Sequence, residues 1–261
     1  MTMAVFPSVV IAGGMPASDD PIFAYTQGRP KALLEMAGRP MIEWVLAALH
    51  ASAHTGDTVI VGLPPETHLQ TTRPVHLLPD QNSLIDNVLA GLAWAAQQQP
   101  DARAVIVSTA DIPTLTSDIV DEFLSRCQPL DKALYYPIVS RQTIEARFPA
   151  SRRTYSRLVD GAFAGGDLVL AQPRIAHTNV ALWQTLAQAR KYPWKMARII
   201  GFTILLKLLF RRLRIADVER QAARLIGLPV AAVPFPHAEI AMDGDKPHQI
   251  DLLRQALASN N

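Results

Sequence analysis

Ser8-Val9-Val10-Ile11-Ala12-Gly13-Gly14 is the segment from which the fold of this chain is first inferred. Its β-branched run predicts a buried strand, and the paired glycines end that strand. Glycines in such a loop let backbone amides approach a phosphate closely, because no side chain stands in the way. The pair alone is a weak signal, since it matches neither the P-loop nor the G-x-G-x-x-G pattern.

Strands and helices alternate outward from this stretch. The spacing of apolar residues predicts helices over 40–53 and 84–98, and strands over 58–61, 75–78 and 104–108. This alternation indicates βαβ units, and therefore an α/β, three-layer Rossmann-like fold with a mainly parallel sheet and helices on both faces.

The second half of the chain is less regular. Strands are expected over 133–139 and 165–170, one or two more within 230–242, and a closing helix over 247–258. Residues 181–227 form a largely helical insert near the C-terminus. No linker or repeat divides the chain, so we expect a single domain over 1–261, with its core in about 6–180 and 228–261.

Composition narrows the possible partners of the protein. Hydrophobic residues make up 49% of the 261 residues and charged residues 18%, which excludes a disordered chain. A formal charge of +2 argues against a nucleic-acid partner. That average hides an asymmetry, because residues 190–224 carry ten Lys or Arg against two acidic residues, a local +8 that leaves −6 elsewhere.

Localisation is expected to be cytoplasmic. The N-terminus lacks the basic region of a signal peptide, and the longest uncharged apolar run, 199–206, is far shorter than a membrane span. The single cysteine, Cys127, cannot form an intrachain disulfide.

Two carboxylate-bearing loops follow expected strands, where ligands of open α/β sheets bind. Asp111 follows the 104–108 strand, and Asp243 and Asp245 flank a glycine just before the closing helix. Either loop suits a divalent cation. Alternatively, Asp111 stabilises a turn before Pro113, and Asp245 caps the helix.

Taken together, these motifs resemble the nucleotidyltransferase superfamily, and within it the molybdenum-cofactor guanylyltransferase-like NTP transferase family. The motifs that carry the resemblance are 10–14 (VIAGG), 29–34 (RPKALL), 37–42 (AGRPMI), 84–92 (LIDNVLAGL), 110–113 (ADIP) and 243–247 (DGDKP). The resemblance implies a fold of glycosyltransferase-A type and Mg²⁺-dependent transfer of a nucleoside monophosphate from an NTP to a small phosphorylated acceptor, with release of pyrophosphate.

The resemblance also implies roles for individual residues. Asp111 and Asp245 would hold Mg²⁺ with Asp243 beside them, and Lys31 would place its charge on the phosphates. The nucleotide-binding residues implied in addition to Lys31 are Ala12, Gly13, Gly14, Arg29, Asp80, Ser83 and Asn87.

The loop after Gly14 departs from the family pattern. The family continues through a third glycine to an arginine, whereas this chain runs Met15-Pro16-Ala17-Ser18-Asp19-Asp20-Pro21 before it reaches Arg29 and Lys31. Arg29 could replace the missing arginine from the far side of the loop. An altered specificity is favoured over a catalytically weakened, nucleotide-binding scaffold, because Lys31, Asp111 and Asp245 remain; a membrane-surface glycosyltransferase is a further alternative.

Fewer residues can be assigned to binding of the acceptor. Arg153, Tyr155 and Arg157 form a basic, aromatic patch that suits an acceptor phosphate, or else an exposed loop. Asn179 is predicted either to bind the acceptor or to cap the next helix. The basic 196–215 helix suits a peripheral membrane contact or a homodimer contact, but a helix packed on the domain with a solvated basic face is favoured.

Overall fold

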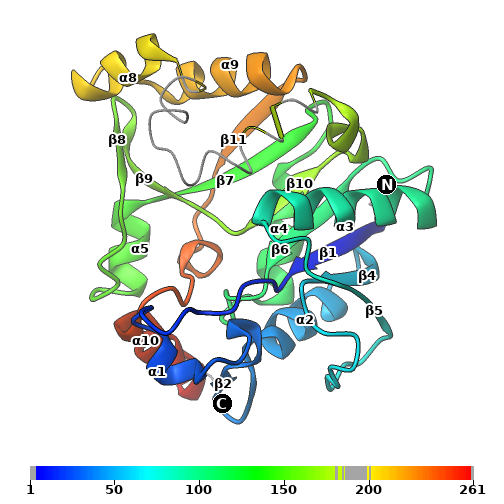
Figure 1. The fold of residues 1–261 in the computed structure, drawn as a ribbon. Coiled ribbons are helices and arrows are strands. Elements are labelled where there is room, and N and C mark those ends of the chain that lie inside the picture. Colours follow the sequence, from blue (N-terminus) through cyan, green and yellow to red (C-terminus); the bar gives the residue numbers. More distant parts are fainter. Residues whose placement is uncertain (1–3, 180–181, 184, 186–198, 200, 260–261) are drawn as a thin grey trace.

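A computed structural model describes residues 4–179, 182, 183, 185, 199 and 201–259. A nine-stranded sheet runs through the described residues, in the order β5-β4-β1-β6-β10-β7-β9-β8, with β11 paired to β7 (Figure 1). The strands are β1 (Phe6–Ile11), β4 (Thr55–Val61), β5 (Val75–Leu78), β6 (Val105–Thr109), β7 (Leu134–Ser140), β8 (Ser156–Leu158), β9 (Gly161–Gly165), β10 (Leu168–Ala171) and β11 (Val230–Pro234). A separate small hairpin joins β2 (Glu35–Met36) to β3 (Arg39–Pro40).

The helices are α1 (Phe23–Thr26), α2 (Met41–Ala51), α3 (Leu84–Gln98), α4 (Ser117–Arg126), α5 (Arg141–Arg147), α8 (Phe202–Leu209), α9 (Ile215–Ile226) and α10 (Pro247–Ala258). Short 3₁₀ turns form η1 (Lys31–Leu33), η2 (Pro173–His177) and η3 (Ala238–Ala241). The expected helices and strands of the first half are confirmed with boundaries within a few residues. Helices α4 and α5 were not expected. Within 230–242, where one or two strands were expected, the structure has one strand followed by η3.

Strand directions confirm the α/β class and its mostly parallel sheet. β5, β4, β1 and β6 are parallel neighbours, and β7, β11 and β8 run in the same direction. Only β10 and β9 run the other way, between or beside them. Local sequence periodicity can predict a strand, but it does not reveal the reversed direction of these two.

Side chains alternate between two cores, as the period of a strand requires. Val9 and Ile11 of β1 join a cluster beneath α3, whereas Phe6 and Val10 join a larger cluster that includes residues of α2, α4 and α10. Helices therefore cover both faces of the sheet, and the predicted three-layer arrangement is confirmed.

The predicted 181–227 insert is described only in part. Helices α8 and α9 lie within it, but residues 196–198 and 200 of the predicted 196–215 helix lie outside the described residues. In the described part, α8 ends at Leu209 and has no fully buried residue, but Ile204 and Leu205 are half-buried and Lys207 pairs with Asp217 of α9. The favoured expectation of a helix packed on the domain is therefore met only in part. The single-domain assignment stays a prediction.

No helix in the described ranges combines the length and the apolar character needed to cross a bilayer.

Candidate functional site

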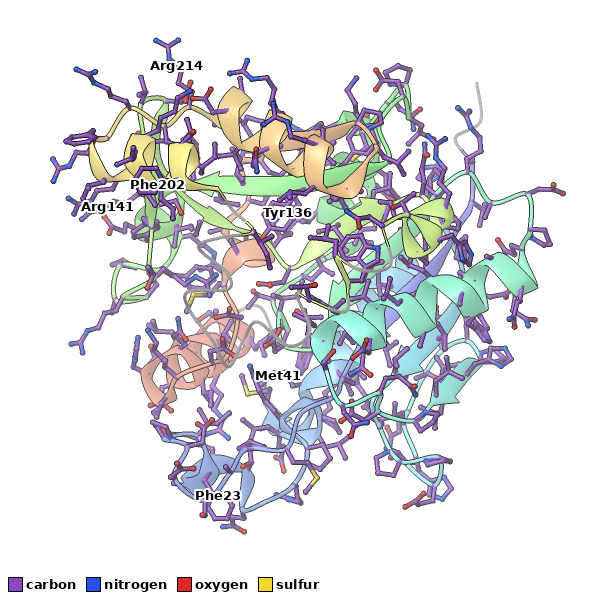
Figure 2. The ribbon with its side chains drawn as sticks, turned by 45° about the horizontal axis from the view of Figure 1, so that its top comes forward. Phe23, Met41, Tyr136, Arg141, Phe202 and Arg214 are labelled. Carbon is purple, nitrogen blue, oxygen red and sulfur yellow. The ribbon has the colours of Figure 1, made fainter. Side chains whose placement is uncertain are left out.

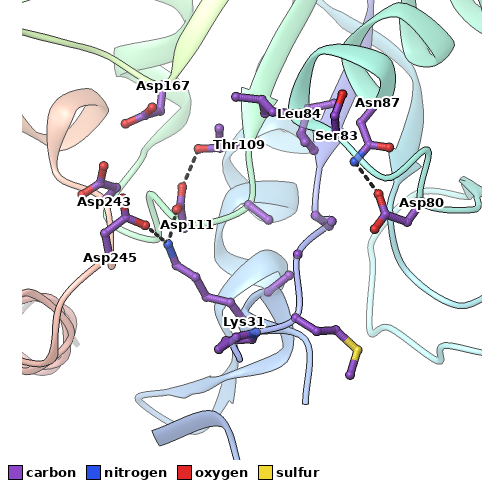
Figure 3. A pocket seen from close by; sticks show the side chains of 18 of the residues that line it. Lys31, Asp80, Ser83, Leu84, Asn87, Thr109, Asp111, Asp167, Asp243 and Asp245 are labelled. Carbon is purple, nitrogen blue, oxygen red and sulfur yellow. Dashed lines mark hydrogen bonds and ion pairs between the residues drawn. The ribbon is translucent and has the colours of Figure 1, made fainter. Parts of the chain in front are cut away.

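A pocket of about 420 Å³ opens at the carboxyl ends of β1 and β6 (Figure 3). Its lining includes Gly13 and Gly14 after β1, Asp111 after β6, and Lys31 from η1. The other predicted residues in the lining are Ala12, Asp80, Ser83, Asn87, Asp243 and Asp245. Parallel strands end at one edge of a sheet, which is why residues far apart in the chain meet here.

Gly13 lies against the side chains of Asp80 and Asn87. A Cβ at this position would lie 2.5 Å from Asn87 Nδ2 and 2.9 Å from Asp80 Oδ1, closer than packing permits. Gly14 adopts a φ of 107°, which side-chain-bearing residues rarely accept. The glycine pair is therefore required both for the close approach of neighbouring groups and for the backbone turn.

Asp80 and Asn87 hold each other in place. Asn87 Nδ2 donates to Asp80 Oδ1 at 2.8 Å, and the backbone amide of Gln81 donates to Asn87 Oδ1 at 2.7 Å. Asn87 is only 2% exposed, so these two hydrogen bonds fix the 79–83 loop to a buried side chain. Ser83 caps α3 by accepting from the amide of Asp86 at 3.0 Å. These three residues form the wall opposite the acidic cluster (Figure 3).

Lys31 connects the two carboxylates that sequence reasoning assigned to metal binding. Its Nζ donates to Asp111 Oδ2 at 2.5 Å and also forms an ion pair with Asp245. The two partners lie 80 and 214 residues from Lys31 in the chain. The side chains of Lys31 and Asp111 are 16% and 19% exposed, so this pair is shielded from bulk water.

The ion pair controls protonation at the centre of the pocket. Burial alone would lower the pKa of Lys31, but the carboxylates of Asp111 and Asp245 outweigh it and raise that pKa. Burial likewise opposes ionisation of Asp111, yet Lys31 and a 2.5 Å hydrogen bond from Thr109 Oγ1 hold the pKa of Asp111 below its usual value. At neutral pH, Lys31 is therefore a cation and Asp111 an anion.

Asp167 belongs to the same acidic cluster and was missed by sequence reasoning. It lies in the break between β9 and β10, where residues 166–169 stand opposite residues 136–137 of β7. The backbone amide of Asp167 donates to the carbonyl of Ile240 at 2.7 Å, which ties this bulge to the loop before Asp243. The only local signal was the glycine pair at 165–166, which also marks an ordinary turn.

The carboxyl group of Asp167 faces the pocket without a partner. Its buried Oδ2 has no hydrogen bond in the described structure, and the residue lines the pocket with Asp243 and Asp245. Burial, together with the carboxylates of Asp111 and Asp243, raises the pKa of Asp167 well above its usual value.

Arg153 balances part of this negative charge by forming an ion pair with Asp243. Burial raises the pKa of Asp243, and Arg153 opposes that rise.

The donor set suits Mg²⁺, a hard cation that prefers carboxylate oxygens. The four acidic side chains of Asp111, Asp167, Asp243 and Asp245 outnumber the two basic side chains beside them, those of Lys31 and Arg153. No group of three His, Cys, Asp or Glu side chains in the described ranges is arranged to hold a metal without help. Mg²⁺ commonly uses one or two protein carboxylates together with substrate phosphates and water, so Asp111 and Asp245 with a bound triphosphate would meet its needs.

The atypical loop contributes an acidic residue and an apolar edge to the pocket. Met15, Pro16 and Asp20 line it, and Asp20 Oδ1 accepts from the amide of Ile22 at 2.9 Å, which shapes the turn into α1. Arg29 does not line this pocket; it is exposed, and its Nε donates to the carbonyl of Thr26 at 3.5 Å. The structure thus gives no support to the expectation that Arg29 replaces the missing arginine in the pocket.

A second, smaller pocket of about 280 Å³ gathers the predicted acceptor residues. Arg153, Tyr155 and Arg157 line it together with Arg141 and Glu145, which sequence reasoning did not include. Because Arg153 also reaches Asp243, it separates this pocket from the acidic cluster.

Asn179 lies outside both pockets. Its Nδ2 donates to the carbonyl of Leu225 at 2.6 Å, and its Oδ1 accepts from the amide of Leu182 at 3.2 Å. These contacts fit the helix-capping alternative.

Known proteins with similar sequences and folds identify the family. Over 123 residues the chain is 32% identical to a molybdenum cofactor guanylyltransferase from Rhodopseudomonas palustris (strain BisB5), a match that covers 44% of this chain and 51% of that protein. The chain therefore spans about half the length of this curated relative.

Solved structures extend the similarity to nearly the whole chain. A hypothetical transferase from Thermus thermophilus is 36% identical with a TM-score of 0.80, over 94% of this chain and 99% of that one. A 2-C-methyl-D-erythritol 4-phosphate cytidylyltransferase, also from Thermus thermophilus, shares the fold, with a TM-score of 0.55 at 20% identity over 98% and 100% of the two chains.

The family model described as "MobA-like NTP transferase domain" matches residues 9–201, which begin in β1 and include the glycine pair, Lys31 and Asp111. With this match and the surrounding fold in agreement, the chain belongs to the MobA-like NTP transferase family of nucleotidyltransferases.

Proposed function

We propose that the protein is a Mg²⁺-dependent nucleotidyltransferase that moves a nucleoside monophosphate from an NTP to a small phosphorylated acceptor. An acceptor phosphate oxygen would attack the α-phosphorus, the bond from that phosphorus to the β-phosphate oxygen would break, and pyrophosphate would leave with the electron pair. The observation that carries the proposal is the Lys31 ammonium held between Asp111 and Asp245 on the floor of the glycine-lined pocket.

Charge neutralisation is the main requirement of this reaction, because two anions must approach each other. Bound Mg²⁺ would supply positive charge at the triphosphate, with Asp111 and Asp245 as its protein ligands and Asp243 beside them. Lys31 adds a fixed point charge, and its short contacts to both aspartates position their carboxylates relative to each other.

The opposite wall of the pocket suits the nucleoside. Gly13 is packed against Asp80, whose position is fixed by Asn87, and the cap at Ser83 holds the start of α3 beside them. We assign the base and sugar to this wall, because it lies across the pocket from the carboxylates that would hold the phosphates (Figure 3).

The acceptor would approach from the Arg153 side. Arg141, Arg153 and Arg157 surround the second pocket with Tyr155, and Arg side chains bind phosphate through a planar fork of donors. An acceptor phosphate bound in this basic pocket would lie on one side of Arg153, with the carboxylates of the first pocket on the other side.

The loop from Gly14 to Pro21 supports an altered specificity as the reason for the departure from the family pattern. Met15 and Asp20 from this loop line the pocket, while Lys31 lies between Asp111 and Asp245.

Pyrophosphate release, measured with each NTP against a panel of small phosphomonoesters, tests the proposal. We expect Mg²⁺-dependent release for at least one pair, and a loss of about 100-fold or more in Asp111→Asn and in Asp245→Asn. Asp101→Asn is the matched control, since Asp101 is exposed and lies outside both pockets. NTP binding without turnover for every acceptor would instead support the scaffold alternative, and full activity of both aspartate variants would refute the assigned site.

A further inference from the structure

Helix α8 presents large apolar side chains to the solvent. Phe202, Leu209 and Phe210 are 75%, 73% and 66% exposed, and Leu206 and Leu208 are also exposed. No residue of α8 is buried in the described structure. Exposed apolar groups clustered in this way usually mark a surface that meets another apolar phase.

Unpaired positive charge directly follows these side chains. Arg211, Arg212 and Arg214 are all exposed, and none of them forms an ion pair with a carboxylate in the described ranges. Lys207 and Arg220 differ, because both pair with Asp217 of α9. The apolar surface is therefore bordered by three cations that remain available to an anionic partner.

The helix is anchored to the domain at one end. The amide of Val159 donates to the carbonyl of Leu213 at 2.9 Å, and the amide of Ile215 donates to Asp160 Oδ2 at 2.9 Å. Leu213 is only 4% exposed, so its burial holds the segment after α8 against the domain. The β8–β9 turn thus holds α8 at an end of the molecule remote from α1 and α10 (Figures 1 and 2).

We propose that α8 and the three arginines after it dock the protein on an anionic phospholipid surface. The eight residues of α8 extend only about 12 Å, far less than the roughly 30 Å of a bilayer's hydrocarbon core, so the helix would lie in the interface. Phe and Leu side chains would enter the acyl boundary while Arg211, Arg212 and Arg214 meet lipid phosphates.

A second copy of the chain fits this surface less well. In a two-fold symmetric contact the same patch faces itself, so the three arginines of each copy would approach those of the other. Like charges at such a contact repel, whereas an anionic lipid surface attracts them.

Vesicle flotation tests the proposal with the full chain. We expect binding to vesicles of phosphatidylcholine and phosphatidylglycerol, weakening as salt rises, and none to phosphatidylcholine alone. Arg211→Gln/Arg212→Gln/Arg214→Gln should lower the partition coefficient about 100-fold, since each arginine contributes about a factor of five at an anionic surface. Arg103→Gln/Lys132→Gln/Arg174→Gln is the matched control, because it removes the same charge far from α8 in sequence and should bind as the wild type does.

A second variant, Phe202→Ala/Leu209→Ala/Phe210→Ala, tests the apolar part without changing the charge. It should also lose vesicle binding while keeping the wild-type circular dichroism melt, because these side chains are exposed. Absence of wild-type binding to anionic vesicles would overturn the proposal. So would a wild-type dimer in light scattering that this variant converts to a monomer, since the surface would then belong to a second copy.

Discussion

Lys31 illustrates how one residue derives its role from partners distant in the chain. An isolated lysine at this place in the sequence would ordinarily be a solvated surface residue, but here it lies between Asp111 and Asp245. Its positive charge offsets the repulsion between the two carboxylates, so both can lie close together in a pocket that is shielded from bulk water.

Lys31→Met should lower kcat/KM for pyrophosphate release by about 100-fold or more, because the phosphates lose a fixed cation at the reacting end. Steady-state kinetics with the best NTP and acceptor pair would measure the loss. Lys132→Met is a matched control that removes another lysine from a lysine–aspartate pair, on the surface beside Asp131. Turnover within about threefold of the wild type in Lys31→Met would contradict the role assigned here.

His50 gives a prediction for pH. The residue is 8% exposed on α2, its Nε2 has no partner in the described structure, and burial together with Arg73 lowers its pKa to about 4. In the unfolded chain the imidazole titrates near 6.5. Between these values the unfolded state binds the proton and the folded state does not, so folded-state stability falls as pH drops from 6.5 toward 4.

His50→Gln should remove this pH dependence. Compared with the variant, the wild type should lose about 3 kcal/mol of unfolding free energy between pH 7 and pH 4, measured by urea titration at each pH. Parallel pH profiles for the two proteins would show that His50 is not buried as a neutral imidazole.

At the level of elements, α3 and β1 approach each other closely at a glycine. Gly91 of α3 lies over Val9 of β1, and a Cβ on Gly91 would lie 2.2 Å from Val9 Cγ1. The helix can therefore approach the sheet only because residue 91 lacks a side chain, and this approach positions Asn87 one turn earlier beneath Asp80.

Gly91→Ala should destabilise the fold by about 1–3 kcal/mol through overpacking, although alanine favours a helix by about 1 kcal/mol. Val9→Ala opens the space that the new methyl group needs, so the double variant should lose less stability than the two single losses added together. Urea unfolding of the four proteins measures this coupling, and simple additivity would contradict the contact.

Some elements were foreseen from local patterns and others were not. Helix α10 begins and ends where its proline and apolar spacing predict, and α3 begins after the Ser83 cap. The reversed strand β10 was foreseen only as a strand, because its direction depends on pairing with β6 and β7 far away in sequence. Helix α4, with a capping threonine at 116, could have been found, but its short apolar stripe follows directly on the Asp111 loop.

At the scale of the whole molecule, opposite charges gather in different places. The carboxylates around Lys31 lie at the carboxyl ends of the strands, whereas Arg211, Arg212 and Arg214 lie beyond α8. The formal charge of +2 for the whole chain is the sum of +8 in residues 190–224 and −6 in the rest, so it describes neither part.

Nucleotide binding should stabilise the folded molecule as a unit. With an NTP at about 100 times its Kd and Mg²⁺ present, Tm should rise by about 5–10 °C, because ligand that binds only the folded state adds about 2.7 kcal/mol. Removal of Mg²⁺ by a chelator should reduce the shift, and Asp111→Asn should reduce it equally with Mg²⁺ present. If neither Mg²⁺ removal nor Asp111→Asn changes the Tm shift, the nucleotide binds without help from the carboxylate cluster.

Local sequence patterns predicted the α/β class, the strand that ends in Gly13 and Gly14, and the carboxylates that follow later strands, because periodicity and turn chemistry act over about ten residues. Three further features became visible in the folded chain: Lys31 bridges Asp111 and Asp245, Asp167 joins them through the break between β9 and β10, and large apolar side chains of α8 face the solvent. These features depend on contacts between segments distant in the chain. Their energies arise from burial and charge in the folded molecule, which no local pattern encodes.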